Sequence, residues 1–261
     1  MIVDRDVPYP SELYLIAMVF FIGRFGAPRL GIGGTGRAFW KNRIGRGRKM
    51  NEFVRLRKEK LADVVVGNLK KHFFDAYSCA TAAEARDLAI SLIPVGSTIG
   101  WGGSATIDAI GIKDALRGGN YRLFDRDLAK TPEERVRIMR SALTADVFLM
   151  SSNAVSADGQ LVNIDANGNR VAALVYGPKS VIVVVGMNKV EATLDLSMAR
   201  AEMVAAPINA GRFPGKTPCR GSGACGHCFS ADSICATVAI TRLSKPANRI
   251  KVILVNEDLD F

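Results

Sequence analysis

The sequence predicts an α/β protein built on an open, three-layer sheet. From residue 51 onward, short apolar runs alternate with segments in which apolar residues recur at helical spacing, as in chains that form parallel sheets flanked by helices. One run, Val181–Val185, contains only valine and isoleucine, which is typical of a central strand covered on both faces. Asp158-Gly159 lies between two further short runs and indicates a hairpin that interrupts the alternation.

The pattern begins with an amphipathic helix over residues 51–73, where apolar side chains recur between lysines and arginines. A strand over 74–79 follows it. Thr81 then has the position of a helix N-cap, with Glu84 three residues later as in a capping box, and Pro94 ends that helix. The next strand continues into the glycine-rich stretch Ser97–Thr106.

The remaining elements follow from the same signals. A helix is expected over 107–116, with Gly111 as an interruption. Thr131-Pro132-Glu133 marks another helix start, because it combines a cap, a first-turn proline and an acidic side chain near the positive dipole end. The other expected elements are strands over 121–124, 145–150, 154–156, 161–164, 181–185 and 250–255, and helices over 131–143, 170–175 and 191–204.

Residues 1–49 differ from the rest of the chain. They hold nine Lys or Arg against three Asp or Glu, so most of the net charge of +10 lies in them. Their second half is rich in glycine and arginine and has no hydrophobic period. We therefore expect an N-terminal extension at 1–49, either disordered or upstream of a true start at Met50, and an α/β domain at 50–261. An amphipathic arm on a membrane surface is the alternative.

The apolar run at residues 13–22 is too short to span a bilayer, and acidic residues precede it where a signal peptide carries positive charge. We therefore expect a cytoplasmic protein without a transmembrane span. Nucleic acid is not an expected partner. Residues 50–261 hold 26 basic and 22 acidic residues, and the cysteine-rich loop 217–236 has one aromatic residue, Phe229.

The glycine-rich stretch predicts a strand, a tight turn and a helix start, and its candidate ligand-binding residues are Gly100, Gly102, Gly103 and Ser104. Glycines let a ligand approach the main chain, and the free N–H groups of a helix start attract anions. The fingerprint G-x-G-x-x-G lacks its last glycine here and the P-loop lysine is missing, so no NAD site is expected. An anion cradle and a plain turn both fit the spacing.

A second candidate cluster is polar. Asn163 and Asp165 fall on the same face of a regular strand, and Asn169 and Arg170 follow shortly after. A carboxylate beside a guanidinium could position a small polar ligand. Turn chemistry is the alternative, since hairpins use the same residue types.

Basic residues lie at both ends of the 181–185 strand, with Lys179 before it and Lys189 after it. Basic groups at strand ends can face the ligand crevice of an open sheet, and Lys179 is included among the binding candidates, although surface lysines are common. The only histidines are His72, on the first helix, and His227, in the cysteine-rich loop. Histidine-based catalysis is therefore not expected outside that loop, and no catalytic residue is named.

Four of the five cysteines follow the pattern C-x5-C-x2-C-x6-C, namely Cys219, Cys225, Cys228 and Cys235. Four thiolates can complete a tetrahedral zinc shell or hold an iron–sulfur cluster, and the spacing does not choose between these cofactors. Disulfides are the alternative, which a reducing cytosol disfavours. Cys79 stands alone in an expected strand and is interpreted as a small buried apolar residue.

Several of these stretches resemble the lactate-utilisation (LUD) domain family. The similarity covers residues 50–261 and rests on Gly100–Ser104 with Ile107–Gly111, Ser152–Asp165 with Gly168–Ala172, Gly177–Gly186, and Asn188-Lys189. The resemblance implies an open α/β sheet related to ribose-phosphate isomerase and CoA-transferase folds, with the glycine loop at the ligand site. Some members are subunits of bacterial systems that oxidise lactate to pyruvate alongside iron–sulfur partners. The family supplies no agreed catalytic residue.

This chain looks like a stand-alone subtype of that family with an added C-terminal cysteine loop. The expected function is a component of bacterial lactate or organic-acid utilisation, with a small anionic ligand at the glycine loop and a metal or iron–sulfur cluster at the four cysteines. If it is an enzyme, an oxidoreductase-associated subunit is expected, with iron–sulfur electron-transfer partners and a homo-oligomeric state as further expectations. A non-catalytic regulatory or scaffold protein with a structural zinc is the alternative.

Overall fold

The computed structural model describes residues 51–261, and the chain divides into two units, Met1–Lys49 and Met50–Phe261. The predictions for residues 1–49 lie outside the described residues. Within residues 51–261, no helix combines the length and apolar character needed to cross a membrane.

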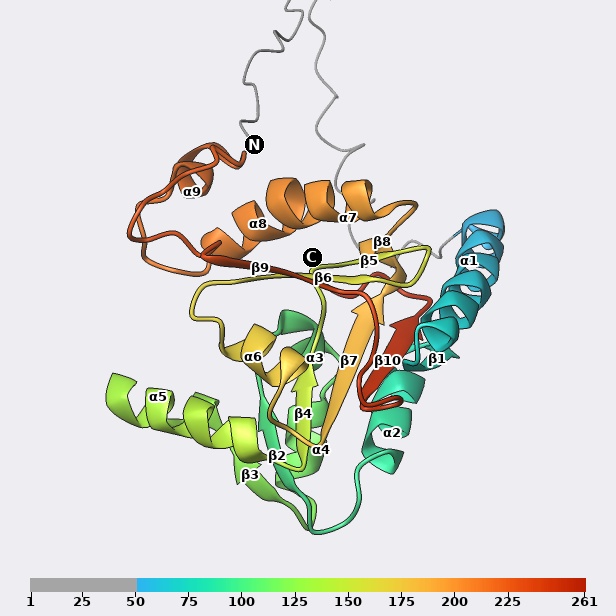
Figure 1. The fold of residues 1–261 in the computed structure, drawn as a ribbon, viewed down its shortest axis with the longest axis horizontal. Helices are drawn as coiled ribbons and strands as arrows, with labels where there is room; N and C mark the ends of the chain where they lie inside the picture. Colours follow the sequence, from blue (N-terminus) through green and yellow to red (C-terminus); the bar gives the residue numbers. More distant parts are fainter. Residues whose placement is uncertain (1–50) are drawn as a thin grey trace, which may run out of the picture. The chain divides into compact units, whose positions relative to one another are not determined.

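Six parallel strands form the main sheet of the second unit (Figure 1). Their order across the sheet is β1 (Asp75–Cys79), β10 (Ile250–Val255), β7 (Ser180–Gly186), β4 (Val147–Met150), β2 (Thr98–Trp101) and β3 (Arg122–Phe124). Val183 of β7 pairs with Val252 of β10 on one side and with Met150 of β4 on the other. All strand pairs in this sheet are parallel, so their carboxyl ends share one edge.

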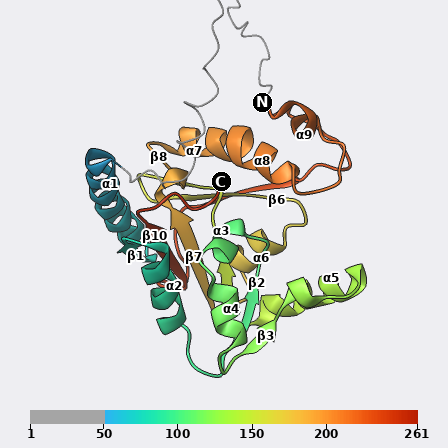
Figure 2. The ribbon, with the colours of Figure 1, turned by 180° about the vertical axis from the view of Figure 1, so that it is seen from behind.

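Helices cover both faces of this sheet, which confirms the predicted open, three-layer α/β architecture. One face is covered by α1 (Glu52–Lys71) and α6 (Asn169–Val175). Figure 2 shows the other face, which is covered by α2 (Ala82–Ser91), α3 (Ala105–Ala109) and α4 (Ile112–Arg117).

The valine-rich run of β7 accounts for this layering. Val181, Val183 and Val185 belong to the buried cluster under α1 and α6, whereas Ile182 and Val184 belong to the cluster under α2, α3 and α4. Successive side chains of a strand point to opposite faces, so a strand buried on both faces must be apolar at every position.

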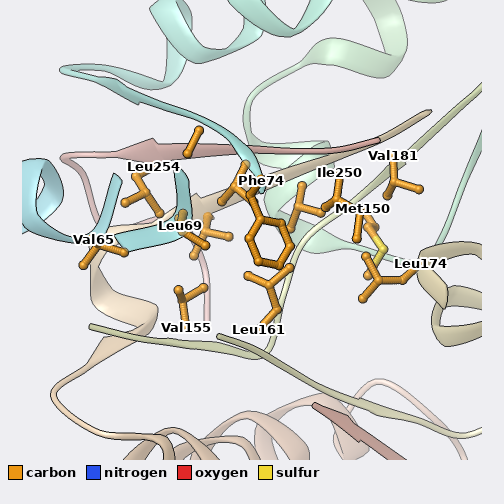
Figure 3. Close-up of a cluster of buried hydrophobic side chains, with 14 of the residues drawn as sticks. Val65, Leu69, Phe74, Met150, Val155, Leu161, Leu174, Val181, Ile250 and Leu254 are labelled. Atoms are coloured by element: carbon orange, nitrogen blue, oxygen red, sulfur yellow. The ribbon is translucent and has the colours of Figure 1, made fainter. Parts of the chain in front are cut away.

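The core on the α1 side surrounds Phe74, which is fully buried among side chains from distant parts of the chain (Figure 3). Leu69 of α1 and Ile250 of β10 belong to the same cluster. Leu161, from a second sheet, also belongs to this cluster, so the two sheets pack against each other through it.

The second sheet has four strands in the order β8 (Val190–Glu191), β5 (Ala154–Ser156), β6 (Leu161–Asp165) and β9 (Thr237–Thr241). β5 and β6 form the predicted antiparallel hairpin. Gly159 has a φ of +94° in its turn, and a Cβ there would lie 2.9 Å from the Asn68 backbone of α1, so only glycine fits.

Two elements differ from the prediction: the helix after β8 and the strand β9. The helix expected over 191–204 begins after the Thr193 cap as α7 (Leu194–Arg200), continues through one π-helical turn and ends as α8 (Ala206–Ala210). β9 was not predicted at all. Its apolar Val238 and Ile240 are exposed, so its alternation lacks the usual burial pattern of a half-buried strand.

Candidate functional site: a charged cleft at the carboxyl edge of the sheet

The carboxyl edge of the main sheet opens into a cleft with a volume of about 730 Å³. Segments that directly follow three strands line it: Gly103–Thr106 after β2, Ser151–Asn153 after β4, and Lys189 after β7. Residues of α3 and α4, Arg126 and Asp127 after β3, the start of α6, and the loops after α8 and before β9 also line it. Ligands of open parallel sheets bind at this edge.

The glycine loop connects β2 to α3, and its four predicted residues have different surroundings. Ser104 caps α3, since its Oγ accepts a hydrogen bond from the Ile107 amide at 3.3 Å. Gly103 is exposed in the cleft, whereas Gly100 is buried in β2, where a Cβ would lie 2.5 Å from that of Ala142. The structure therefore assigns Gly100 to packing and Gly103 to the wall of the cleft.

Gly102 makes room for Arg170, because a Cβ on this glycine would overlap the Arg170 side chain. The Arg170 guanidinium donates to the Ile164 carbonyl at 2.7 Å and to Asn153 Oδ1 at 3.1 Å. It also donates to Asn163 Oδ1 at 3.4 Å. Burial lowers the pKa of Arg170. The glycine loop and the polar cluster are thus in direct contact through Gly102 and Arg170.

Asp165 and Asn169 complete the polar cluster. The Asp165 carboxylate accepts hydrogen bonds from the backbone amides of Arg170 at 2.8 Å and Val171 at 3.2 Å, and so holds the start of α6. Asn169 is the first residue of that helix and lines the cleft. Of the sequence candidates, the structure brings together Gly102, Gly103, Ser104, Asn163, Asp165, Asn169 and Arg170.

Gly102→Ala is expected to lower the free energy of unfolding by about 1–3 kcal/mol, because the added methyl forces the hydrogen-bonded Arg170 side chain to move. Urea denaturation measures the change. Gly103→Ala is the matched control, since its Cβ would come no closer than 3.5 Å to the Arg126 guanidinium and should change stability little. Equal stability of the two variants would contradict this account of Gly102.

Lys179 lies apart from these residues. It precedes β7 at the amino edge of the parallel sheet, is exposed, and forms an ion pair with Asp146 at 2.8 Å. The two ends of one strand lie at opposite edges of a sheet, so Lys179 and Lys189 cannot serve the same site. The basic residue at the carboxyl end, Lys189, is the one that lines the cleft.

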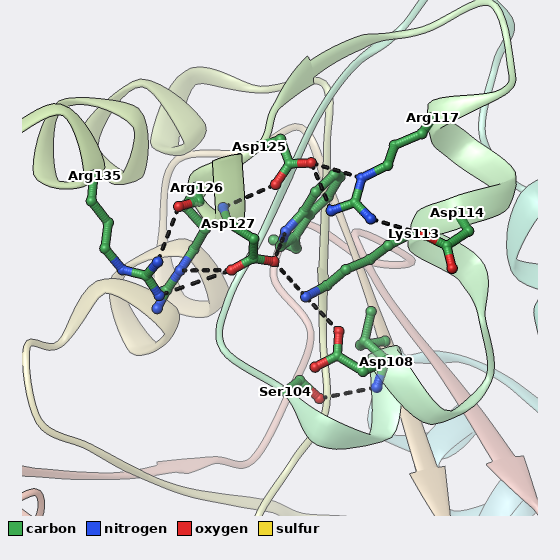
Figure 4. A network of polar contacts seen from close by, with 11 residues as sticks. Ser104, Asp108, Lys113, Asp114, Arg117, Asp125, Arg126, Asp127 and Arg135 are labelled. Atoms are coloured by element: carbon green, nitrogen blue, oxygen red, sulfur yellow. Dashed lines mark hydrogen bonds and ion pairs between the residues drawn. The ribbon is translucent and has the colours of Figure 1, made fainter. Parts of the chain in front are cut away.

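A network of ion pairs centred on Asp127 forms another wall of the cleft (Figure 4). One oxygen of Asp127 accepts hydrogen bonds from Lys113 Nζ at 2.7 Å and from Trp101 Nε1 at 3.0 Å. Lys113 also pairs with Asp108 at 2.6 Å. Burial alone would raise the pKa of Asp127, but the hydrogen bond and charge of Lys113 outweigh it, and the pKa is lowered. Lys113 is therefore neutralised by carboxylates of the protein itself.

Arg126 lies between this network and the glycine loop. Its Nε is buried and has no hydrogen-bond partner within residues 51–261. The nearest carboxylate oxygen, Asp127 Oδ1, is 3.9 Å from Arg126 Nε and 3.9 Å from the Arg135 guanidinium, too far to be a hydrogen-bond acceptor for either. Burial, and then the charge of Arg135, lower the pKa of Arg126.

The sequence reasoning missed Arg126 as a site residue. A signal was available, because Arg126 follows the short strand at 121–124 and basic groups after parallel strands can face the ligand crevice. Arg126 lies between Asp125 and Asp127 in the sequence, which suggests that these carboxylates neutralise it and that it is not available to a ligand.

The cysteine-rich loop adjoins the cleft. Cys219 is buried in α9 (Pro218–Ser222), Cys225 and Cys228 are half-buried, Cys235 is exposed, and all are free thiols. The amide of His227 donates to Cys225 Sγ at 3.5 Å. Desolvation, and then the charges of Cys225, Cys219 and Cys228, raise the pKa of Cys235 to about 11.

The sulfurs do not have ligand geometry in this structure. Within residues 51–261, no group of three or more His, Cys, Asp or Glu side chains is arranged to hold a metal ion. Residues 231–234, between Cys228 and Cys235, line the cleft, so the loop forms part of its wall.

The fold and this cleft define an α/β protein with a charged site at the carboxyl edge of a parallel sheet. The protein belongs to the LUD domain family, whose sequence model matches residues 62–255. A comparison with curated proteins gives no match.

Two solved structures are similar to this chain. One is a DUF162 family protein from Deinococcus radiodurans, with 16% identity, a TM-score of 0.45, and coverage of 76% of this chain and 98% of that chain. The other is eIF2B delta from Chaetomium thermophilum, with 16% identity, a TM-score of 0.26, and coverage of 55% of this chain and 57% of that chain.

Proposed function

We propose that this LUD-domain protein binds a small organic acid, such as lactate or pyruvate, in the cleft and acts as a component of organic-acid utilisation. The observation that supports the proposal most directly is Arg126, whose guanidinium lies beside Gly103 and whose buried Nε has no hydrogen-bond partner within residues 51–261. An unpaired donor of this kind is costly unless an acceptor occupies the site in the working protein.

The distribution of charge in the cleft favours an anion. Asp127 already accepts two hydrogen bonds through one oxygen, and its other oxygen is 3.9 Å from both Arg126 and Arg135. The two guanidinium groups therefore keep donors for a further acceptor. A carboxylate is the natural complement, because it accepts two parallel N–H bonds from a guanidinium.

The four cysteines belong to the same proposal as the ligands of a zinc ion or an iron–sulfur cluster. Their residue types fit either cofactor, and the backbone amide donated to Cys225 is in keeping with a thiolate site. An iron–sulfur cluster would supply one-electron chemistry, with electron-transfer proteins as partners, whereas zinc would hold the loop.

Arg126→Gln is expected to weaken binding of the organic acid about tenfold or more, because hydrogen bonds to charged groups contribute about 1.5–3 kcal/mol. Lactate, pyruvate, sugar phosphates and CoA esters are added separately, and the rise in Tm of wild type and variant is compared. The matched control is Arg122→Gln, which removes an exposed arginine of β3 that does not line the cleft.

A variant that keeps wild-type affinity would exclude Arg126 as a ligand group. If none of these anions raises the Tm of the wild-type protein, the organic-acid proposal is wrong. Binding without any turnover in the presence of an electron acceptor would instead favour the regulatory or scaffold role.

A further inference from the structure

Two lysines are buried in the cleft, and their partners differ. Lys113 is 7% exposed and has carboxylates of Asp108 and Asp127 at 2.6 and 2.7 Å. Lys189 is 3% exposed, and its Nζ donates to the Thr106 hydroxyl at 2.8 Å. Within residues 51–261, no carboxylate lies within ion-pair distance of Lys189. Lys113 is thus held by two carboxylates, whereas Lys189 forms no direct ion pair in the part of the chain that the structure describes.

The chain just before Lys189 is closely packed. It is the last residue of the short 3-10 helix η3 (Met187–Lys189), directly after the central strand β7. A Cβ on Gly186 would lie 2.6 Å from the Leu259 amide, so the chain at this point is closely covered. Thr106, the hydrogen-bond partner, is itself buried in α3 next to the glycine loop.

The surroundings of Lys189 destabilise its charged form. Burial lowers the pKa of Lys189 to about 8, with Asp260 acting in the opposite direction and Arg200 and Arg170 adding to the decrease. About one amine in ten is then neutral at pH 7, far more than for an exposed lysine. Neutral lysines in desolvated, cation-rich surroundings are the ones that act as nucleophiles toward carbonyl groups.

We propose that Lys189 forms a Schiff base with the carbonyl carbon of a small oxo acid whose carboxylate binds the guanidinium groups of the cleft. This inference rests on the proposed organic-acid site and narrows its ligand to acids that also carry a ketone or aldehyde group. A hydroxy acid such as lactate would bind without reacting.

The step needs no further reactant. The ammonium first releases one proton. The nitrogen lone pair of the neutral amine then attacks the carbonyl carbon, the carbonyl π pair moves to oxygen, and a proton passes from the nitrogen to that oxygen, which gives a carbinolamine. The proton released at the start adds to the same oxygen, which leaves as water while the nitrogen lone pair forms the C=N bond, and the nitrogen becomes an iminium with one hydrogen. Overall, one ammonium and one carbonyl become one iminium and one water, with charge unchanged.

Borohydride reduction of the full-length protein in the presence of pyruvate tests the proposal. Reduction of the iminium adds the mass of pyruvic acid less one oxygen atom to the modified lysine, which peptide mass spectrometry locates. We expect the adduct at Lys189 and not at Lys113, which is buried in the same cleft and serves as the internal control. Lys189→Arg keeps the positive charge and should lose at least nine-tenths of the adduct. Glyoxylate provides a second, smaller oxo acid.

The outcomes separate this inference from the proposed function. If pyruvate or glyoxylate raises the Tm but no adduct forms at Lys189, the Schiff base is wrong and the organic-acid site stands. Equal labelling of Lys113 and Lys189, or an undiminished adduct in Lys189→Arg, also overturns it. If these acids and lactate leave the Tm unchanged and no adduct forms, the organic-acid site and the Schiff base are both wrong.

Discussion

Lys189→Met is expected to raise the free energy of unfolding of the ligand-free protein by about 2 kcal/mol at pH 7. The drop in the pKa of Lys189 from 10.5 to about 8 corresponds to a penalty of about 3 kcal/mol on its charged form. Methionine has a similar length and no charge, and loss of the hydrogen bond to Thr106 offsets about 1 kcal/mol of the gain. Urea denaturation of both proteins measures the difference.

The stability difference should depend on pH in a defined direction. Below about pH 8 the lysine is charged in both the folded and the unfolded protein, and the penalty is fully present. Between about pH 8 and 10.5 only the unfolded state binds the proton, so wild-type stability rises relative to the variant and the penalty disappears. Other groups that titrate in this range, such as Cys235, cancel when the two proteins are compared at each pH.

Lys113→Met is the matched control, because it removes the other buried lysine of the cleft. It leaves Asp108 and Asp127 without their shared cation and should lower stability, the opposite sign to Lys189→Met. If both variants are destabilised to the same extent, or if the Lys189 difference does not change with pH, Lys189 is an ordinary structural lysine.

The helices, strands and turns were predictable wherever residues close together in the sequence determine them. The Thr81 and Thr131 caps accept the predicted hydrogen bonds from the Glu84 and Glu134 amides. The chain then reverses at Gly159 as its sequence indicates. β9 was not predictable, because its pairing with β6 depends on a partner far away in the chain and leaves Val238 exposed.

The site was only partly predictable from sequence for the same physical reason. Asn163, Asp165 and Arg170 lie close together in sequence, so the local pattern located them. Whether a basic side chain can bind a ligand depends on which carboxylates of the protein already form ion pairs with it in the folded structure. Asp127 bonds to Lys113, fourteen positions away, more closely than to its neighbour Arg126, and no sequence pattern reveals that choice.

The proposed four-cysteine site predicts that Cys225→Ser removes most of its metal from protein purified without oxygen. A serine hydroxyl stays protonated at neutral pH and cannot replace a soft thiolate in a four-sulfur shell. Metal analysis and the visible spectrum measure the loss, and the wild-type spectrum identifies the cofactor: a brown protein indicates an iron–sulfur cluster, whereas a colourless protein that accepts tetrahedral cobalt indicates zinc. Cys79→Ala is the control, since Cys79 is buried in β1 outside the loop.

Loss of the metal should also affect the cleft, because residues 231–234 lie between Cys228 and Cys235 and form part of its wall. Without a metal bound to the four cysteines, backbone hydrogen exchange over 219–235 should become faster, and the affinity for pyruvate should fall several-fold. Unchanged metal content in Cys225→Ser would show that the four cysteines are not the ligands. Loss of metal with unchanged exchange and affinity would show that the metal does not order this wall.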